Sequence, residues 1–108
     1  MKIMIRVGID LGADKIRLVT ENEGLLFDEA CIVALDQKGN VLAIGDEAKE
    51  MKESLDQKIR VISPLSKNKI DFDALHALLE QLIYDYKVFR MFKKTVLLFS
   101  YPMALNRQ

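Results

Sequence analysis

The chain has 108 residues, of which half are hydrophobic and 30% are charged; this composition fits one small domain with a buried core and excludes a disordered tail. Sixteen basic and sixteen acidic residues cancel, so the chain lacks the positive charge that draws proteins to nucleic acid. A single cysteine excludes an internal disulfide, and no apolar run approaches the ~20 residues of a membrane-spanning helix. We therefore expect a cytoplasmic protein without a nucleic-acid partner.

The first predicted element is a hairpin whose strands are Ile3–Val7 and Ile16–Thr20. Between them, Val7–Gly12 places a glycine on each side of an aspartate, and we expect this segment to form the turn. Glycines let a backbone approach a ligand closely, and successive turn amides can cradle a phosphate. Asp10 could hold a divalent metal through water. The alternative is an ordinary hairpin turn, because such turns favour the same residues.

Short apolar and β-branched runs predict further strands, separated by polar turns. The helix predicted after them would place Ala48, Met51 and Leu55 on one face. Asp28 and Glu29 are expected at a bend or at a sheet edge, and residues 66–69 as a polar connection. Cys31 lies in an apolar run, where a buried and inert thiol is the favoured interpretation. The predicted strands are Leu25–Phe27, Cys31–Leu35, Val41–Ile44 and Lys58–Ile62, and the helix is Asp46–Leu55.

The clearest helix follows Asp71 or Asp73, either of which suits an N-cap, and it carries an apolar stripe from Leu75 to Tyr86. His76 falls beside the stripe and is expected at the surface. The continuous apolar run Thr95–Phe99 predicts a central strand parallel to the first strand and beside it. Residues 100–102 would then share one sheet edge with the phosphate-binding turn. The order of elements predicts an α/β layer with a helix packed on a mixed sheet.

Four stretches of the sequence carry a resemblance to a known family: Val7–Gly12, Ile32–Asp36 followed by Gly39–Met51, Ile62–Leu65 ahead of Ile70–Phe72, and Thr95–Phe99 with Pro102. Together they resemble the N-terminal part of the MreB-like rod shape-determining proteins, which are bacterial actin homologues. The second stretch is the most diagnostic, because other actin-fold families differ there.

The resemblance implies an actin-like ATPase fold of which the chain covers the first third. Residues 1–28 and 63–108 would form part of the ribonuclease-H-like subdomain IA, and residues 29–62 the small subdomain IB. It implies a cytoskeletal protein that binds ATP and Mg²⁺ and forms membrane-associated filaments organising cell shape and cell-wall synthesis. With the second phosphate motif and second lobe missing, this chain would hold half a site and not hydrolyse ATP alone. The implied nucleotide-binding residues are Gly8, Asp10, Leu11, Gly12, Ala13 and Lys15, with Asp10 also near the metal.

The sequence departs from the family pattern directly after Gly12. Ala13 stands where the family has a hydroxyl donor, worth about 1.5–3 kcal/mol against a charged phosphate. Asp14 adds a negative charge near the expected position of the phosphates. Lys15 could give its ammonium group to the phosphates or simply face solvent.

Residues 86–94 interleave apolar side chains with Lys and Arg, a pattern suited to the surface of an anionic bilayer. By resemblance, the corresponding loop inserts into the membrane, and Met91, Phe92 and Lys93 fall on its hydrophobic pair and following lysine. The alternative is that these apolar residues pack under the helix end, which is the interpretation favoured for Val88 and Phe89.

Two other functions stay open from the sequence. A non-catalytic interaction module that caps or regulates such filaments is favoured by the substitutions after Gly12. Another actin-superfamily member, an FtsA-like division protein or a pilus-assembly ATPase, is suggested by residues 12–16, although residues 44–49 argue against it. The resemblance implies three partners: other copies of the chain, the inner membrane surface and membrane proteins of cell-wall elongation.

Overall fold

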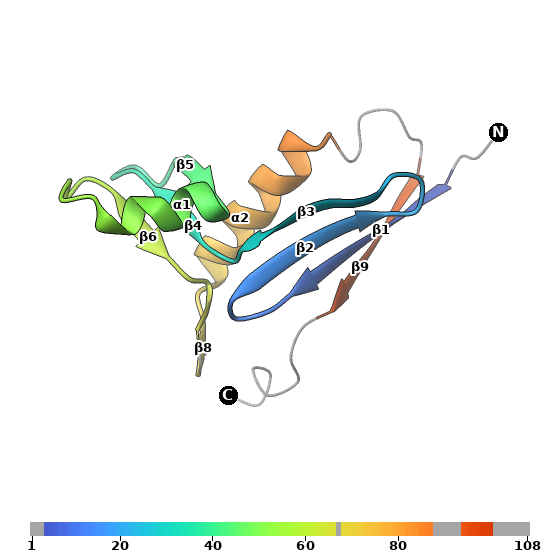
Figure 1. Cartoon of the computed structure of the whole chain (residues 1–108), viewed down its shortest axis with the longest axis horizontal. Helices are drawn as coiled ribbons and strands as arrows, with labels where there is room; N and C mark the ends of the chain where they lie inside the picture. Colours follow the sequence, from blue (N-terminus) through green and yellow to red (C-terminus); the bar gives the residue numbers. More distant parts are fainter. Residues whose placement is uncertain (1–3, 67, 88–93, 101–108) are drawn as a thin grey trace.

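A computed structural model describes residues 4–66, 68–87 and 94–100, with nine strands and three helical segments in those ranges (Figure 1). The strands are β1 (Met4–Leu11), β2 (Lys15–Thr20), β3 (Gly24–Ala30), β4 (Val33–Leu35), β5 (Val41–Ile44), β6 (Arg60–Ile62), β7 (Leu65–Ser66), β8 (Lys69–Ile70) and β9 (Lys94–Ser100). The helices are α1 (Asp46–Glu50), the 3₁₀ turn η1 (Met51–Glu53) and α2 (Phe72–Asp85). The predicted α/β class is confirmed.

The main sheet has the strand order β3-β2-β1-β9. The β1–β2 pair is antiparallel and the β1–β9 pair is parallel, so the predicted position of the last strand beside the first is confirmed. The prediction that this strand is central is wrong for the part of the chain that the structure describes, where β9 lies at the sheet edge. A continuous apolar run indicates burial of both strand faces and does not specify a second neighbour.

Alternation of side chains gives the main sheet one buried face and one open face. In β2, Ile16 and Leu18 point into the core, whereas Lys15, Arg17 and Val19 point outward. The predicted bend at residues 28–29 is wrong, because β3 continues through them to Ala30. The alternative prediction of a sheet edge is right, since β3 is an outer strand. Asp28 is tolerated there because an edge strand leaves one flank open to water.

Helix α2 packs its apolar stripe against the buried face of the main sheet and against the small sheet. It begins where predicted: the Asp71 carboxylate accepts a hydrogen bond from the Ala74 N–H at 3.0 Å, which satisfies one free amide of the first turn. Leu78 and Leu82 have no exposed surface. His76 lies on the solvent side with 77% of its side chain exposed, so its predicted surface position is confirmed.

The small sheet has the order β5-β4-β6, and α1 covers it through a second apolar cluster. The turn predicted at residues 36–40 is present. The Asp36 carboxylate accepts hydrogen bonds from the N–H groups of Asn40 and Lys38 at 2.8 and 2.9 Å. These bonds, the one from Asn40 first, hold the pKa of Asp36 below its usual value.

The helix predicted over residues 46–55 is shorter in the structure, which ends α1 at Glu50 and η1 at Glu53. Leu55 lies outside the helix and is 96% exposed, so its predicted place on the apolar face is wrong. The Ser54 and Asp56 side chains accept backbone hydrogen bonds within their own loop, which competes with helix formation. The polar connection predicted at residues 66–69 is replaced by the β7–β8 hairpin.

Candidate functional site

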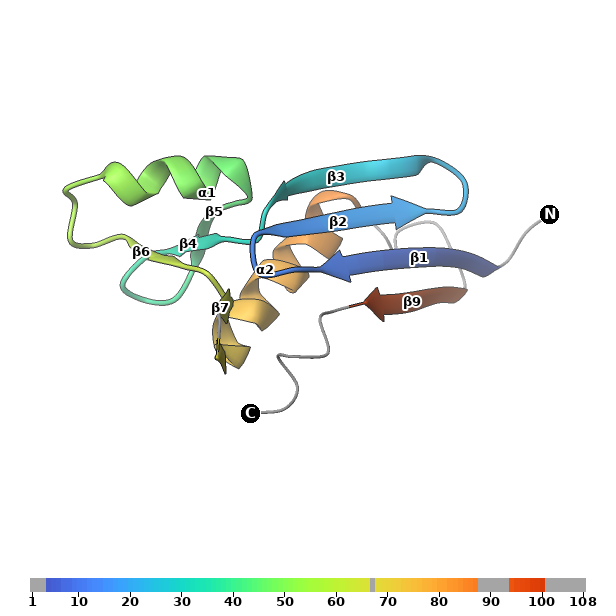
Figure 2. The ribbon, with the colours of Figure 1, turned by 60° about the horizontal axis from the view of Figure 1, so that its bottom comes forward.

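The β1–β2 connection lies at the end of the main sheet that faces the small sheet (Figure 2). The structure corrects the predicted turn. Gly8 and Asp10 belong to strand β1, opposite Val19 and Arg17 of β2, and the connection comprises only residues 12–14. Neither Gly8 nor Gly12 has a positive φ angle, and a Cβ on Gly8 would lie 4.0 Å from the nearest atom. Strand pairing, rather than a special backbone conformation, therefore fixes Asp10.

Within the turn, the Gly12 N–H donates to the Lys15 carbonyl at 2.8 Å and closes the hairpin. A Cβ on Gly12 would lie 3.2 Å from that carbonyl oxygen, so this glycine allows a close approach of the chain to itself. Among the described residues, no group accepts a hydrogen bond from the amides of Ala13 or Asp14. The Leu11 side chain is buried in the core, so only its backbone faces the turn. The two exposed amides are the groups that an anion could use.

Charged side chains line the open face of the sheet beside this turn. The Arg17 guanidinium lies 3.2 Å from the Asp28 carboxylate, and the Lys15 ammonium lies 3.8 Å from the same carboxylate. Asp28 therefore competes with any anion for Lys15. In the described part of the chain, no cation lies within ion-pair distance of Asp10, which is exposed at the end of β1.

The parallel register aligns Asp10 with Ser100, which confirms that the turn and the end of the last strand share one sheet edge. Tyr101 and Pro102 lie outside the described residues. No group of three or more His, Cys, Asp or Glu side chains that could hold a metal occurs within the described ranges. A metal at Asp10 would thus have fewer than three such side chains from the described residues and would need water or phosphate oxygens to complete its coordination.

Cys31, which follows β3, has no exposed surface. Burial raises the pKa of its thiol to about 11, which leaves almost no thiolate at neutral pH. The predicted burial is confirmed, and the environment does not favour a nucleophile.

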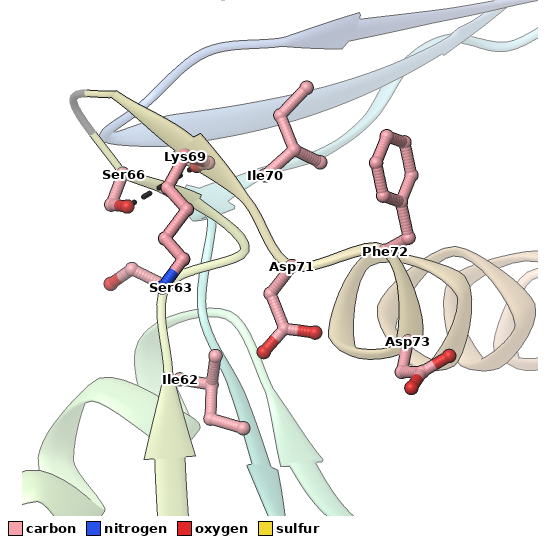
Figure 3. Close-up of a pocket in the computed structure, with 8 residues that line it drawn as sticks. All are labelled: Ile62, Ser63, Ser66, Lys69, Ile70, Asp71, Phe72 and Asp73. Carbon is pink, nitrogen blue, oxygen red and sulfur yellow. Dashed lines mark hydrogen bonds between the residues drawn. The ribbon is translucent and has the colours of Figure 1, made fainter. Parts of the chain in front are cut away.

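A cavity of about 540 Å³ lies between β6, the β7–β8 hairpin and the first turn of α2 (Figure 3). The sequence prediction missed it because residues 66–69 were expected to be a simple connection. The signal available in the sequence was Phe72, an apolar residue between Asp71 and Asp73, which is 71% exposed at the start of α2. The lining residues are Ile62, Ser63, Ser66, Lys69, Ile70, Asp71, Phe72 and Asp73. None of them is a predicted phosphate-binding residue.

The predicted membrane-contact residues Met91, Phe92 and Lys93 lie outside the described residues, as do Val88 and Phe89. Among the helices that the structure describes, none is both long and apolar enough to cross a bilayer.

The geometry agrees with comparisons to known proteins. Residues 4–107 match the model of the MreB/Mbl protein family. The chain is 35% identical over 102 residues to the cell shape-determining protein Mbl of Bacillus subtilis (strain 168), covering 93% of this chain and 31% of Mbl. It therefore spans about a third of that relative.

Solved structures show the same fold. MreB5 of Spiroplasma citri, crystallised with AMPPNP, superposes with a TM-score of 0.77 at 22% identity, covering 95% of this chain and 32% of MreB5. A MamK double helical filament gives a TM-score of 0.62 at 18% identity, covering 87% of this chain and 32% of MamK. The fold is thus actin-like and partial, corresponding to the N-terminal part of these proteins, and the chain belongs to the MreB/Mbl family.

Proposed function

We propose that the chain is the N-terminal region of a cell-shape cytoskeletal protein that binds ATP and forms filaments at the inner face of the cytoplasmic membrane. Residues 1–28 and 63–108 correspond in this proposal to subdomain IA, and residues 29–62 to subdomain IB. The observation that carries it is the family match over residues 4–107, joined to a turn with two exposed amides at the carboxyl ends of β1 and β9.

In the proposed site, the Ala13 and Asp14 amides donate to phosphate oxygens, with Leu11 and Gly12 forming the backbone directly before them and Gly8 giving β1 a position without a side chain. The Asp10 carboxylate would hold a Mg²⁺ ion through water, and the bound ion would supply charge neutralisation for the phosphates. Lys15 reaches the phosphates only by leaving Asp28, from which its ammonium is 3.8 Å away. Nucleotide binding at this site is supported by the structures of MreB5, which was crystallised with AMPPNP and with ADP. The chain alone holds half a site and is not expected to hydrolyse ATP.

We expect millimolar Mg·ATP to shift the amide resonances of residues 12–15 in an NMR titration of the ¹⁵N-labelled chain. The Asp10→Ala variant should weaken this response, because it removes the carboxylate beside the metal. Asp36→Ala, in the distant turn of the small sheet, is the matched control and should respond like the unmodified chain. Unmoved resonances at residues 12–15 would contradict nucleotide binding by this turn.

A second candidate, a non-catalytic interaction module that caps or regulates filaments, is favoured by the chemistry of the same turn. Lys15 is engaged by Asp28, and Asp14 places a negative charge beside the two exposed amides. A module that has lost nucleotide binding should show no response to Mg·ATP, so the same titration separates the two functions.

The proposed partners are other copies of the chain, the membrane surface and membrane proteins of cell-wall elongation. Self-association is supported by the filament formed by MamK, which shares the fold. A nucleic-acid partner is not proposed, because basic and acidic residues balance.

Membrane contact is proposed for Met91, Phe92 and Lys93, on the strength of the cationic and apolar sequence around them. We expect the chain to float with anionic vesicles and the double variant Met91→Ser/Phe92→Ser to lose most of this binding. Leu55→Ser is the matched control, since it removes an exposed apolar side chain from the loop after η1. Equal flotation of the double variant and the unmodified chain would overturn the assignment.

A further inference from the structure

The end of β3 and the residue that follows it are hydrogen-bonded to two different parts of the chain. On one side, the Cys31 N–H donates to the Asp14 carbonyl of the β1–β2 turn at 3.0 Å. On the other side, the Ala30 N–H donates to the Asp46 carboxylate at 2.9 Å. Two consecutive amides thus connect the proposed phosphate-binding turn with the first residue of α1.

The attachment to α1 is reciprocal. The Asp46 N–H donates to the Glu29 carboxylate at 2.9 Å, and the Gly45 N–H donates to the Ile32 carbonyl at 2.9 Å. Together with the bond from Ala30 to Asp46, these contacts tie the start of α1 to the end of β3 (Figure 2). We refer to Glu29, Ala30, Gly45 and Asp46 as the clasp.

Burial makes the hydrogen bonds of the Ala30 and Cys31 amides costly to lose. Ala30 is 5% exposed and Cys31 is fully buried, so water cannot readily replace a missing acceptor at either amide. A carboxylate that accepts from a backbone N–H is also a stronger partner than a neutral oxygen. Removing the Asp46 side chain therefore leaves the Ala30 amide without its acceptor. The adjacent Cys31 amide is then held less firmly in position.

We infer that Asp46 is a positioning residue for the β1–β2 turn, acting through Ala30 and Cys31 on Asp14. This inference rests on the proposed phosphate-binding role of that turn. The positions of the α1 helix and of the small sheet that it covers are then coupled to the position of the turn. By thermodynamic reciprocity, an anion bound at the Ala13 and Asp14 amides stabilises the clasp, and an intact clasp favours anion binding.

Amide hydrogen exchange and chemical shifts of the 108-residue chain, measured by NMR without any ligand, test the connection. Asp46→Ala should speed exchange at Ala30 and Cys31 about tenfold or more and shift the amide resonances of residues 13–15. Asp46→Asn keeps an oxygen acceptor and should stay close to the unmodified chain. Glu47→Ala is the matched control, because it removes the neighbouring acidic side chain of the same helical turn, for which the structure shows no hydrogen bond to another described residue.

A role of Asp46 limited to α1 would change the amides of α1 and of Ala30 while leaving Cys31 and residues 13–15 unmoved, and that result would overturn the inference. If Asp46→Ala unfolds the chain, exchange also accelerates at Leu78 in α2. Glu29→Ala, which removes the acceptor of the Asp46 N–H and so loosens Asp46 without deleting its carboxylate, then replaces it. Unmoved resonances at residues 13–15 in that variant would again overturn the inference. Because no nucleotide is present, absence of ATP binding by the chain would not affect this readout.

Discussion

The substitution Gly45→Ala is expected to lower the free energy of unfolding by at least about 3 kcal/mol. Gly45 has φ +73° and ψ −142°, a backbone conformation that is almost confined to glycine. A Cβ there would overlap the Glu29 carboxylate and lie 2.8 Å from Cζ of Phe27, a buried ring of the main sheet. The alanine variant therefore combines backbone strain with displacement of a clasp residue and a core ring.

Urea denaturation of the variant, followed by circular dichroism, measures this loss. Gly24→Ala is the matched control, because Gly24 has nearly the same φ of +76° but no atom within 4 Å of an added Cβ. Its free energy of unfolding should fall only by the cost of the backbone conformation for alanine, about 1 kcal/mol. Equal losses in the two variants would show that the packing around Gly45 contributes nothing.

The elements that could be predicted are those in which the residues of a single segment show the periodicity of a strand or of a helix. The alternation in β2 and the apolar stripe of α2 both follow from the sequence period, and the Asp71 cap follows from residue chemistry. The pattern failed at residues 51–55, where Met51 and Leu55 keep helical spacing. There, local hydrogen bonds of Ser54 and Asp56 end the helix. Periodicity indicates which residues could share one face of a helix. It does not indicate where side chains compete with the helix for backbone hydrogen bonds.

The candidate site was predictable only in its chain location. Glycine and aspartate at residues 8–12 indicated the turn, but the strand runs to Leu11 and takes Gly8 and Asp10 with it. The neighbours that decide the chemistry come from elsewhere: Asp28 from the edge strand and Asp46 from α1. Sheet pairing brings Asp28 beside Lys15, and packing of α1 brings Asp46 to Ala30. Neither contact has a signature in local spacing, so three-dimensional structure was needed to find them.

The second large effect is expected from Leu78→Ala, with a loss of about 3–5 kcal/mol of the free energy of unfolding. Leu78 is completely buried in α2, in a cluster that contains Ile9 of the main sheet and Val33 of the small sheet. Removing its side chain leaves a cavity where the two sheets and the helix meet.

Because one cluster joins both sheets, the variant should still unfold in a single transition with a lower urea midpoint. Tyr84→Ala, on the same helix at a residue that is 76% exposed, is the control and should change stability by about 0.5 kcal/mol or less. Two separate transitions in Leu78→Ala would instead mean that the small sheet and the main sheet unfold independently and that the shared cluster does not couple them.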